Sequence, residues 1–223
     1  MNHLVVFGDS WPHGDELAPG EKTFGELISD ALGLTFQRYT QPASSVDHMV
    51  WSLRNFLETN PGVDFSKYCA LFCITSIERS MTWNQNYWMF QTIRGGFGHP
   101  QDNALSTELN RLYWKYFYSP EQALFRANNS IVCLQALCRR YGIKDYYVAG
   151  WQTLDLWSEI DLDRFYLAGQ VSMADMIDLK MANGVVIREN PYIWPNQSKP
   201  NQAGHKIIAD TLCKWICDHA QQT

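Results

Sequence analysis

Short apolar segments alternate with amphipathic segments along most of this chain, and this alternation constrains its fold more than any other feature. Leu4–Phe7 and Tyr68–Ile74 are apolar throughout, as strands buried in a parallel sheet should be. Between them, Thr23 can cap a helix whose apolar residues recur at helical spacing and which ends at Gly33. Strands that alternate with helices in this way predict an α/β fold, with a mostly parallel sheet covered by helices on both faces.

The same patterns give approximate bounds for each element. The predicted strands are residues 4–7, 34–39, 68–74 and 144–149. The predicted helices are residues 24–32, 46–57 after a Ser45 cap, 106–117, 120–141 and 172–181, with a last helix that starts at Pro200. Apart from the short helix at 172–181, residues 150–195 have no clear periodicity.

Aromatic and polar residues interrupt the pattern at residues 81–100. This stretch is too long for an ordinary connection, so we interpret it as an insertion or a lid. It contains Trp83, Tyr87, Trp88 and Phe97 among asparagine, glutamine and glycine. These rings could stack on a sugar or an acyl chain, form a small core of the insertion itself, or anchor a protein partner.

Composition narrows the class of protein. A chain of 223 residues with 46% hydrophobic residues can bury one substantial core, so we expect a single domain over residues 1–223. The net charge of −5 argues against nucleic acid as the main partner. No segment approaches the roughly 20 apolar residues that span a bilayer, and the amino terminus lacks a signal-peptide pattern. We therefore expect a cytoplasmic protein without a membrane partner.

Six cysteines are spaced in three loose pairs, with no tight Cys-x-x-Cys pair and no histidine at zinc-finger spacing. Reduced, buried thiols are the favoured interpretation. Cys213 and Cys217 would lie one turn apart on a helix, and this spacing leaves a soft metal open as an alternative.

Two motifs lie near opposite ends of the chain. Gly8-Asp9-Ser10 directly follows the first strand, and Pro200-Asn201-x-x-Gly204-His205 opens the last helix. Together they resemble the GDSL, or SGNH, hydrolase family, and residues 8–17 look like the short versions found in bacteria and their phages. The resemblance implies a flavodoxin-like, three-layer α/β/α sandwich that hydrolyses an ester or acylated small molecule, with no metal and no cofactor.

On this resemblance Ser10 is the nucleophile, projecting above the carboxyl ends of the strands where open α/β sheets bind ligands. The alternative is a turn serine that merely caps a helix. The amides of Ser10, Ala43 and Ser44 would hold the oxyanion, although the family carries a glycine where Ala43 and Ser44 stand. After the third strand only Ser76 could replace the usual donor, and one lost donor slows such a reaction about a hundred- to a thousandfold.

The general base is where the sequence departs from the family. Aligning the terminal motif leaves Lys199 at the catalytic histidine and Asn196 at the orienting acid. Loss of that histidine costs on the order of a million-fold in rate, so the standard mechanism should not operate. Lys199 would have to be neutral to act as a base, and a helix starting at Pro200 would favour that form. Alternatively, Lys199 is solvated, is paired with Asp9, or binds an anionic ligand.

Other residues offer alternative bases or acids. His13 follows Ser10 by three residues, His48 lies near the loop expected to face the nucleophile, and His205 lies inside the last helix. A surface, capping or structural role is the alternative for each histidine. Asp155, in the irregular region, could also supply a catalytic acid.

Two hypotheses of function follow. The first is a serine-dependent ester or acyl hydrolase with Ser10 as nucleophile and a rebuilt base. The second is a catalytically inactive descendant of this fold that binds a ligand or a protein through the same pocket or through the aromatic insertion.

Overall fold

The computed structural model describes residues 1–15, 17–84, 89–93, 104–179, 181–182, 185–186, 190–193 and 199–220. Within them, four parallel strands form the central sheet in the order β2-β1-β3-β6. These strands are β1 (His3–Gly8), β2 (Thr35–Thr40), β3 (Tyr68–Ile74) and β6 (Lys144–Ala149). Each lies within about one residue of a predicted strand. Because all four run parallel, their carboxyl ends meet at one edge of the sheet.

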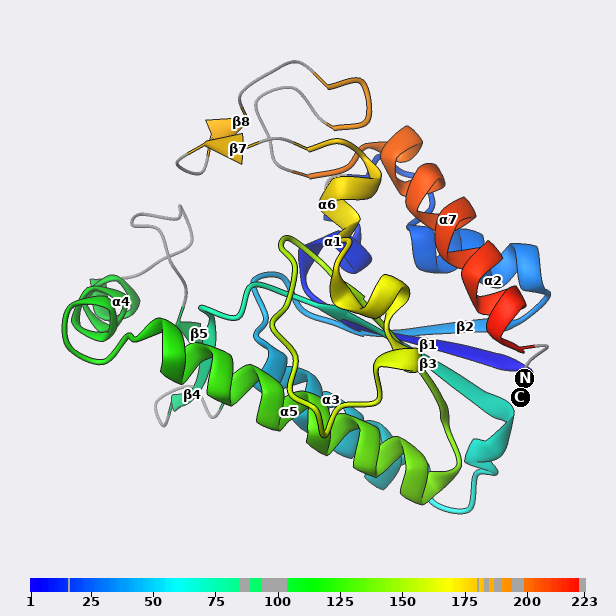
Figure 1. Cartoon of the computed structure of the whole chain (residues 1–223), viewed down its shortest axis with the longest axis horizontal. Helices are drawn as coiled ribbons and strands as arrows, with labels where there is room; N and C mark the ends of the chain where they lie inside the picture. The colour runs from blue at the N-terminus through cyan, green and yellow to red at the C-terminus, as the bar shows by residue number, and fades with distance from the viewer. Residues whose placement is uncertain are drawn as a thin grey trace.

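Helices cover both faces of this sheet, as Figure 1 shows. One face is covered by α3 (Val46–Thr59) and α5 (Pro120–Tyr141), and the other by α2 (Phe24–Leu32) and α7 (Gln202–Ala220). The arrangement is a three-layer α/β/α sandwich, which confirms the predicted fold class.

Smaller elements connect these layers. The helical ones are α1 (Ser10–His13), η1 (Phe65–Lys67), α4 (Ala104–Tyr116), η2 (Leu162–Arg164), η3 (Tyr166–Gly169) and α6 (Met173–Met176). The short strands are β4 (Ser80–Asn84), β5 (Met89–Ile93), β7 (Met181–Ala182) and β8 (Val185–Val186).

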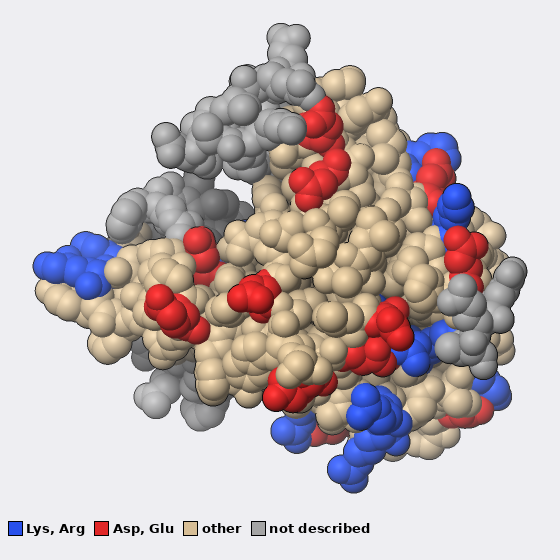
Figure 2. All heavy atoms as spheres, viewed as in Figure 1, with Lys and Arg blue, Asp and Glu red and all other residues tan. Residues whose placement is uncertain are grey.

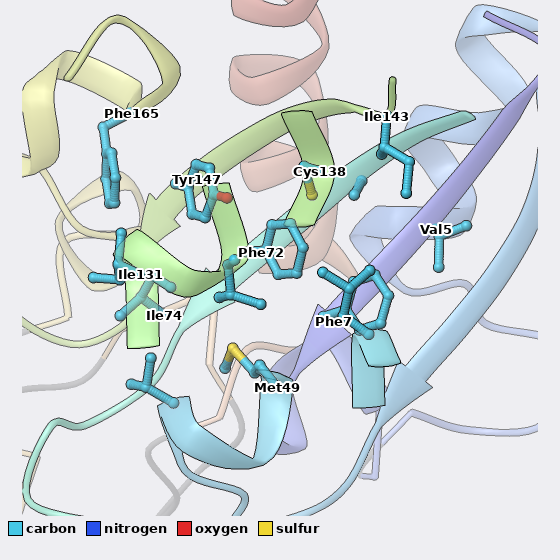
Figure 3. Packing of buried hydrophobic residues seen from close by; sticks show 14 of the residues in the cluster. Val5, Phe7, Met49, Phe72, Ile74, Ile131, Cys138, Ile143, Tyr147 and Phe165 are labelled. Atoms are coloured by element: carbon cyan, nitrogen blue, oxygen red, sulfur yellow. The ribbon is translucent and has the colours of Figure 1, made fainter. Parts of the chain in front are cut away.

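A row of stacked aromatic rings crosses the sheet on the α3–α5 side. Phe7 stacks on Phe72 with ring centroids 4.9 Å apart, and Phe72 stacks on Tyr147 at 5.0 Å. Phe165 extends the row beyond Tyr147 at 4.8 Å (Figure 3). Tyr39 extends it at the other end, 5.7 Å from Phe7. All five rings occupy register-matched positions, so stacking stabilises the strand order that the hydrogen bonds set.

Phe165 belongs to a segment without predicted structure. It forms an isolated parallel bridge with Tyr147, and Ser172 forms a second with Ala149. The segment between these bridges therefore runs along the outer side of β6 and covers that edge of the sheet.

Helix ends follow the predicted capping signals in part. Thr23 forms a capping box with Glu26, as its sequence position indicates. Ser45 occupies the cap position of α3, but its side chain makes no capping hydrogen bond. Helix α6 is shorter than the predicted 172–181, because Asp178 adopts a left-handed φ of 50° just after it.

The prediction that Pro200 starts the last helix is wrong. Pro200 instead forms an antiparallel bridge with Ile193, and α7 begins at Gln202. The side chain of Asn201 accepts a hydrogen bond from the Gly204 amide at 3.0 Å and so caps the helix. Lys199 therefore lies outside the cap position, and the dipole argument for a neutral Lys199 does not hold.

The predicted insertion at residues 81–100 is described in part. Strands β4 and β5 pair in antiparallel fashion, with Trp83 opposite Phe90. The Met81 amide donates to Asp47 of α3 at 3.1 Å, and this bond ties β4 to that helix. Tyr87, Trp88 and Phe97, the other aromatic residues named from the sequence, lie outside the described residues.

All six cysteines lie in described parts of the chain and are free thiols. Cys69, Cys73 and Cys138 are buried, as expected. Cys213 and Cys217 are only half-buried, and Cys133 is exposed, so the expectation of a buried thiol is wrong at Cys133. Within the described residues, no cluster of three or more histidine, cysteine or acidic side chains could hold a metal ion.

The described helices include none that is long and apolar enough to span a membrane. On the face shown in Figure 2, acidic and basic side chains are interspersed, and on its described part the basic ones form no continuous stripe.

Candidate active site

Ser10 lies at the carboxyl edge of the sheet, where β1 passes directly into α1. Its side chain is largely buried, with 6% of the residue exposed. No described residue forms a hydrogen bond with its hydroxyl group. Gly8 permits this tight turn, because a Cβ there would lie 2.5 Å from Pro12 Cγ. The hydroxyl thus lies at the edge of the sheet where the carboxyl ends of the four parallel strands meet.

The neighbouring Asp9 is buried and paired with Arg79, whose Nη1 lies 2.7 Å from Asp9 Oδ2. Thr75 and Trp151 also donate to this carboxylate oxygen. Sequence reasoning missed this set of contacts. The sequence offered only a weak signal for these contacts: Arg79 lies a few residues after the third predicted strand, and Trp151 lies just after the fourth.

The loop after β2 supplies a candidate oxyanion donor. Ala43 has a left-handed φ of 61°, a conformation that favours glycine. Its amide has no acceptor among the described residues. By contrast, the Ser44 amide donates to the Gln41 carbonyl at 3.0 Å, and the Ser44 hydroxyl donates to the Gly8 carbonyl. Because its amide is engaged in a turn, Ser44 is a weaker candidate donor than Ala43.

Ser76, the remaining oxyanion candidate, follows β3 and is partly buried. Its carbonyl accepts a hydrogen bond from the Arg79 amide at 3.3 Å. This turn carries the arginine back toward Asp9.

Lys199 lies in an ion pair, with its Nζ 3.6 Å from Asp15 Oδ2. The partner is Asp15 and not Asp9, which is occupied by Arg79. The other oxygen of Asp15 lies 3.5 Å from His13 Nε2. The structure therefore brings Lys199 and His13 together on either side of one carboxylate. Asn196 lies outside the described residues.

His13 is held on its other side by Thr40 at the end of β2. Its Nδ1 lies 3.0 Å from Thr40 Oγ1 and 3.2 Å from the Thr40 carbonyl oxygen. A hollow of about 430 Å³ extends from His13 and Asp15 along the following loop, and its polar lining includes Glu21, Glu26 and Arg38.

His48 lies in the first turn of α3, buried, with its Nδ1 3.4 Å from Ser52 Oγ. Burial lowers the pKa of His48, and the nearby Asp47 carboxylate opposes this shift. Asp155, named from the sequence as a possible acid, is exposed, and its carbonyl accepts a hydrogen bond from Asn128 of α5.

His205 is buried between α7 and α2. Its Nδ1 accepts a hydrogen bond from the Phe24 amide at 3.1 Å, and burial lowers its pKa to about 4. This arrangement suits a structural role better than that of a base at neutral pH.

The terminal motif docks α7 onto the beginning of α2. Gln202 accepts a hydrogen bond from the Lys22 amide at 2.8 Å, and its own side-chain amide donates to the Lys22 carbonyl at 3.2 Å. Gly204 lies so close to the Tyr192 carbonyl that a Cβ would overlap it. These contacts fix the position of α7, which begins three residues after Lys199.

The chain resembles known proteins in fold but not in sequence. No protein-family model and no curated protein matches the sequence. Among solved structures, the psychrotrophic esterase EstA from Pseudoalteromonas sp. is 9% identical, with 99% of this chain and 100% of that chain covered and a TM-score of 0.55. TesA is 11% identical, with 96% and 98% covered and a TM-score of 0.52.

An acetyl xylan esterase from Butyrivibrio proteoclasticus gives a TM-score of 0.53 at 10% identity, with 100% of this chain and 65% of that chain covered. At such identities the likeness shows the fold alone. The chain has the three-layer fold of SGNH hydrolases, as the two sequence motifs predicted.

Proposed function

We propose that the protein is a serine hydrolase of the SGNH type that acts on an ester or acylated small molecule, with Ser10 as nucleophile. The observation that carries this proposal is the placement of Ser10. Its hydroxyl lies at the carboxyl end of β1 without a described hydrogen-bond partner, and the Ala43 loop follows the adjacent strand. The esterases of similar fold support the proposal by analogy.

In the proposed reaction Ser10 Oγ attacks the carbonyl carbon while its proton passes to a base. The amides of Ser10 and Ala43 stabilise the negative charge on the carbonyl oxygen. The alcohol or thiol leaves with a proton, and water then hydrolyses the acyl-serine ester. We assign the rebuilt base to Lys199 or His13, the two basic side chains that flank Asp15.

A second candidate function is ligand binding without turnover, and the Lys199–Asp15 ion pair favours it. A carboxylate stabilises the charged ammonium form, which has no lone pair to accept a proton. In this case the charged Lys199 would contact an anionic ligand, or the aromatic insertion would contact a protein partner.

Covalent labelling by a fluorophosphonate, located by mass spectrometry, separates the two functions. The hydrolase proposal predicts a label on Ser10 that is absent in Ser10→Ala. Loss of the true base should slow the labelling of Ser10 about a hundred- to ten-thousandfold. The labelling rate is therefore measured in Lys199→Met, His13→Gln and His48→Gln and compared with that of the wild type. Lys206→Met, which alters an exposed lysine paired with Asp210 on α7, is the matched control.

Folded protein that remains unlabelled under conditions that label a known serine esterase would contradict the hydrolase and favour the binding protein. Labelling of Ser10 that only His48→Gln slows would move the base to His48, and labelling that none of the three substitutions slows would locate the base elsewhere. Either result would contradict the assignment of the base to Lys199 or His13.

A further inference from the structure

The Asp9–Arg79 pair joins the loops that follow all four strands of the sheet. Asp9 follows β1, and its Oδ2 accepts hydrogen bonds from Thr75 after β3 at 2.7 Å and from Trp151 after β6 at 3.4 Å. The same oxygen pairs with Arg79 at 2.7 Å. Asp9 is 2% exposed, so its negative charge is compensated within the protein and not by water.

Arg79 connects Asp9 to the loop after β2, the one strand that Asp9 itself does not reach. Its Nη1 contacts Asp9 Oδ2, Thr75 Oγ1 at 2.8 Å and the Ser44 carbonyl at 3.4 Å. Ser44 belongs to the loop after β2, directly beside the candidate oxyanion donor Ala43. One guanidinium nitrogen thus contacts the loop with the proposed nucleophile, the loop with the candidate oxyanion donor and the loop after β3.

The main chain around Arg79 is itself fixed to a helix. Arg126 of α5 donates from Nη2 to the carbonyl of Ile77 at 3.1 Å and to that of Arg79 at 3.0 Å. The guanidinium of Arg79 is therefore presented from a backbone that is anchored to the α3–α5 layer.

Displacement of the Asp9 carboxylate would move the nucleophile. Asp9 caps α1 through a hydrogen bond from the Trp11 amide to Oδ1 at 3.3 Å, and Ser10 lies between these two residues. A buried carboxylate that loses its cation is left uncompensated and must change its position or its protonation state. Either change alters the turn that holds Ser10.

We propose that Arg79 is a positioning residue, which acts through Asp9 and Ser44 to hold the Ser10 hydroxyl and the Ala43 amide in their reactive arrangement. The inference rests on the proposed hydrolase function and adds to it a residue that no motif of the sequence marks. Arg79 need not touch the substrate in this role.

The first test measures the rate at which fluorophosphonate labels Ser10 in folded protein. Arg79→Met should slow labelling about a hundredfold, since a misplacement of about 1 Å costs that much in rate. Arg79→Lys keeps the positive charge and should recover part of the rate. The matched control Arg54→Met removes an exposed arginine of α3 paired with Glu58, and it should label like the wild type.

If Arg79→Met does not fold, the double variant Asp9→Asn/Arg79→Met removes both charges and leaves none unpaired. The double variant should fold, and fluorophosphonate should label its Ser10 as slowly as expected for Arg79→Met. Wild-type labelling rates in a folded Arg79→Met or in the double variant would overturn the proposal.

A second readout does not require activity. The rings of Trp11 and Trp151 lie 4.7 Å apart, close enough for exciton coupling in circular dichroism, and Trp151→Phe identifies their signal. We expect folded Arg79→Met to lose this signal and Arg54→Met to keep it. If wild-type Ser10 is not labelled, the hydrolase proposal fails by itself. In that case, an unchanged exciton signal in Arg79→Met would overturn the positioning role as well. Loss of the exciton signal in Arg79→Met would uphold the role of Arg79 in holding the Ser10 turn.

Discussion

His205 Nδ1 accepts a hydrogen bond from the backbone amide of Phe24, and the two rings stack with centroids 5.6 Å apart. A backbone amide can only donate, so Nδ1 carries no proton in the folded protein. The contact joins the last helix to the first turn of α2. The histidine of the terminal motif therefore has a structural task close to the candidate site.

This contact predicts a loss of stability in acid. Burial lowers the pKa of His205 from 6.5 to about 4. Above pH 6.5 both folded and unfolded chains hold a neutral imidazole, and the contribution to stability is complete. As the pH falls from 6.5 toward 4, the unfolded chain binds the proton first, so the free energy of unfolding decreases by about 3 kcal/mol. Urea denaturation at pH 7 and pH 4 measures this decrease.

The control is His205→Asn, whose side-chain oxygen can still accept from the Phe24 amide but does not titrate. This variant should lose less stability in acid than the wild type. The buried His48 shifts stability in the same direction in both proteins, so it cancels in the comparison. Equal losses in the two proteins would contradict the assigned protonation of His205.

Ala43→Gly should stabilise the protein. An alanine with a φ of 61° pays about 1 to 2 kcal/mol for the left-handed conformation, and the added flexibility of glycine in the unfolded chain offsets only part of this cost. We expect a gain of about 0.5 to 1 kcal/mol in the free energy of unfolding, measured by urea denaturation. Ala18→Gly, at an exposed loop alanine without a positive φ, should give no gain. A destabilised Ala43→Gly would show that the loop is not strained.

Gly204→Ala should destabilise the protein, although alanine usually strengthens a helix by up to about 1 kcal/mol. The new methyl group would overlap the Tyr192 carbonyl and would lie 2.9 Å from Pro200 Cβ. Overpacking of this kind costs about 1 to 3 kcal/mol. A rise in the thermal midpoint of Gly204→Ala would refute this close approach. The comparison variant Ala203→Gly, at the exposed neighbouring position, should lose no more than about 1 kcal/mol.

The central fold was predictable because its signals are local. The strand at 68–74 and the helix at 120–141 have the predicted bounds, since an apolar run marks the strand and Pro120 and Gly142 mark the ends of the helix. The start of α7 was not predicted, because the bridge between Ile193 and Pro200 depends on a contact between separate segments. Pro200 favours a helix start locally, but here Asn201 supplies the cap.

The candidate site was predictable only where a motif marks it. Ser10 follows from its position after the first strand, and the structure places it at the expected edge of the sheet. The partners of charged residues could not be deduced: Asp9 pairs with Arg79, and Lys199 pairs with Asp15. Both pairings depend on how loops from different parts of the chain meet in space. The spacing of residues along the sequence does not encode this arrangement.

The bonds from Lys22 to Gln202 and from Phe24 to His205 join residues 180 and 181 positions apart. Of the described elements, α7 is the last to leave the ribosome, and until then the apolar residues Leu4, Val6 and Leu71 lack the part of their cover that α7 supplies beside α2. Contacts so distant in sequence form late in folding. A nascent chain that stalls before α7 would expose this side of the sheet to chaperones, proteases and other chains.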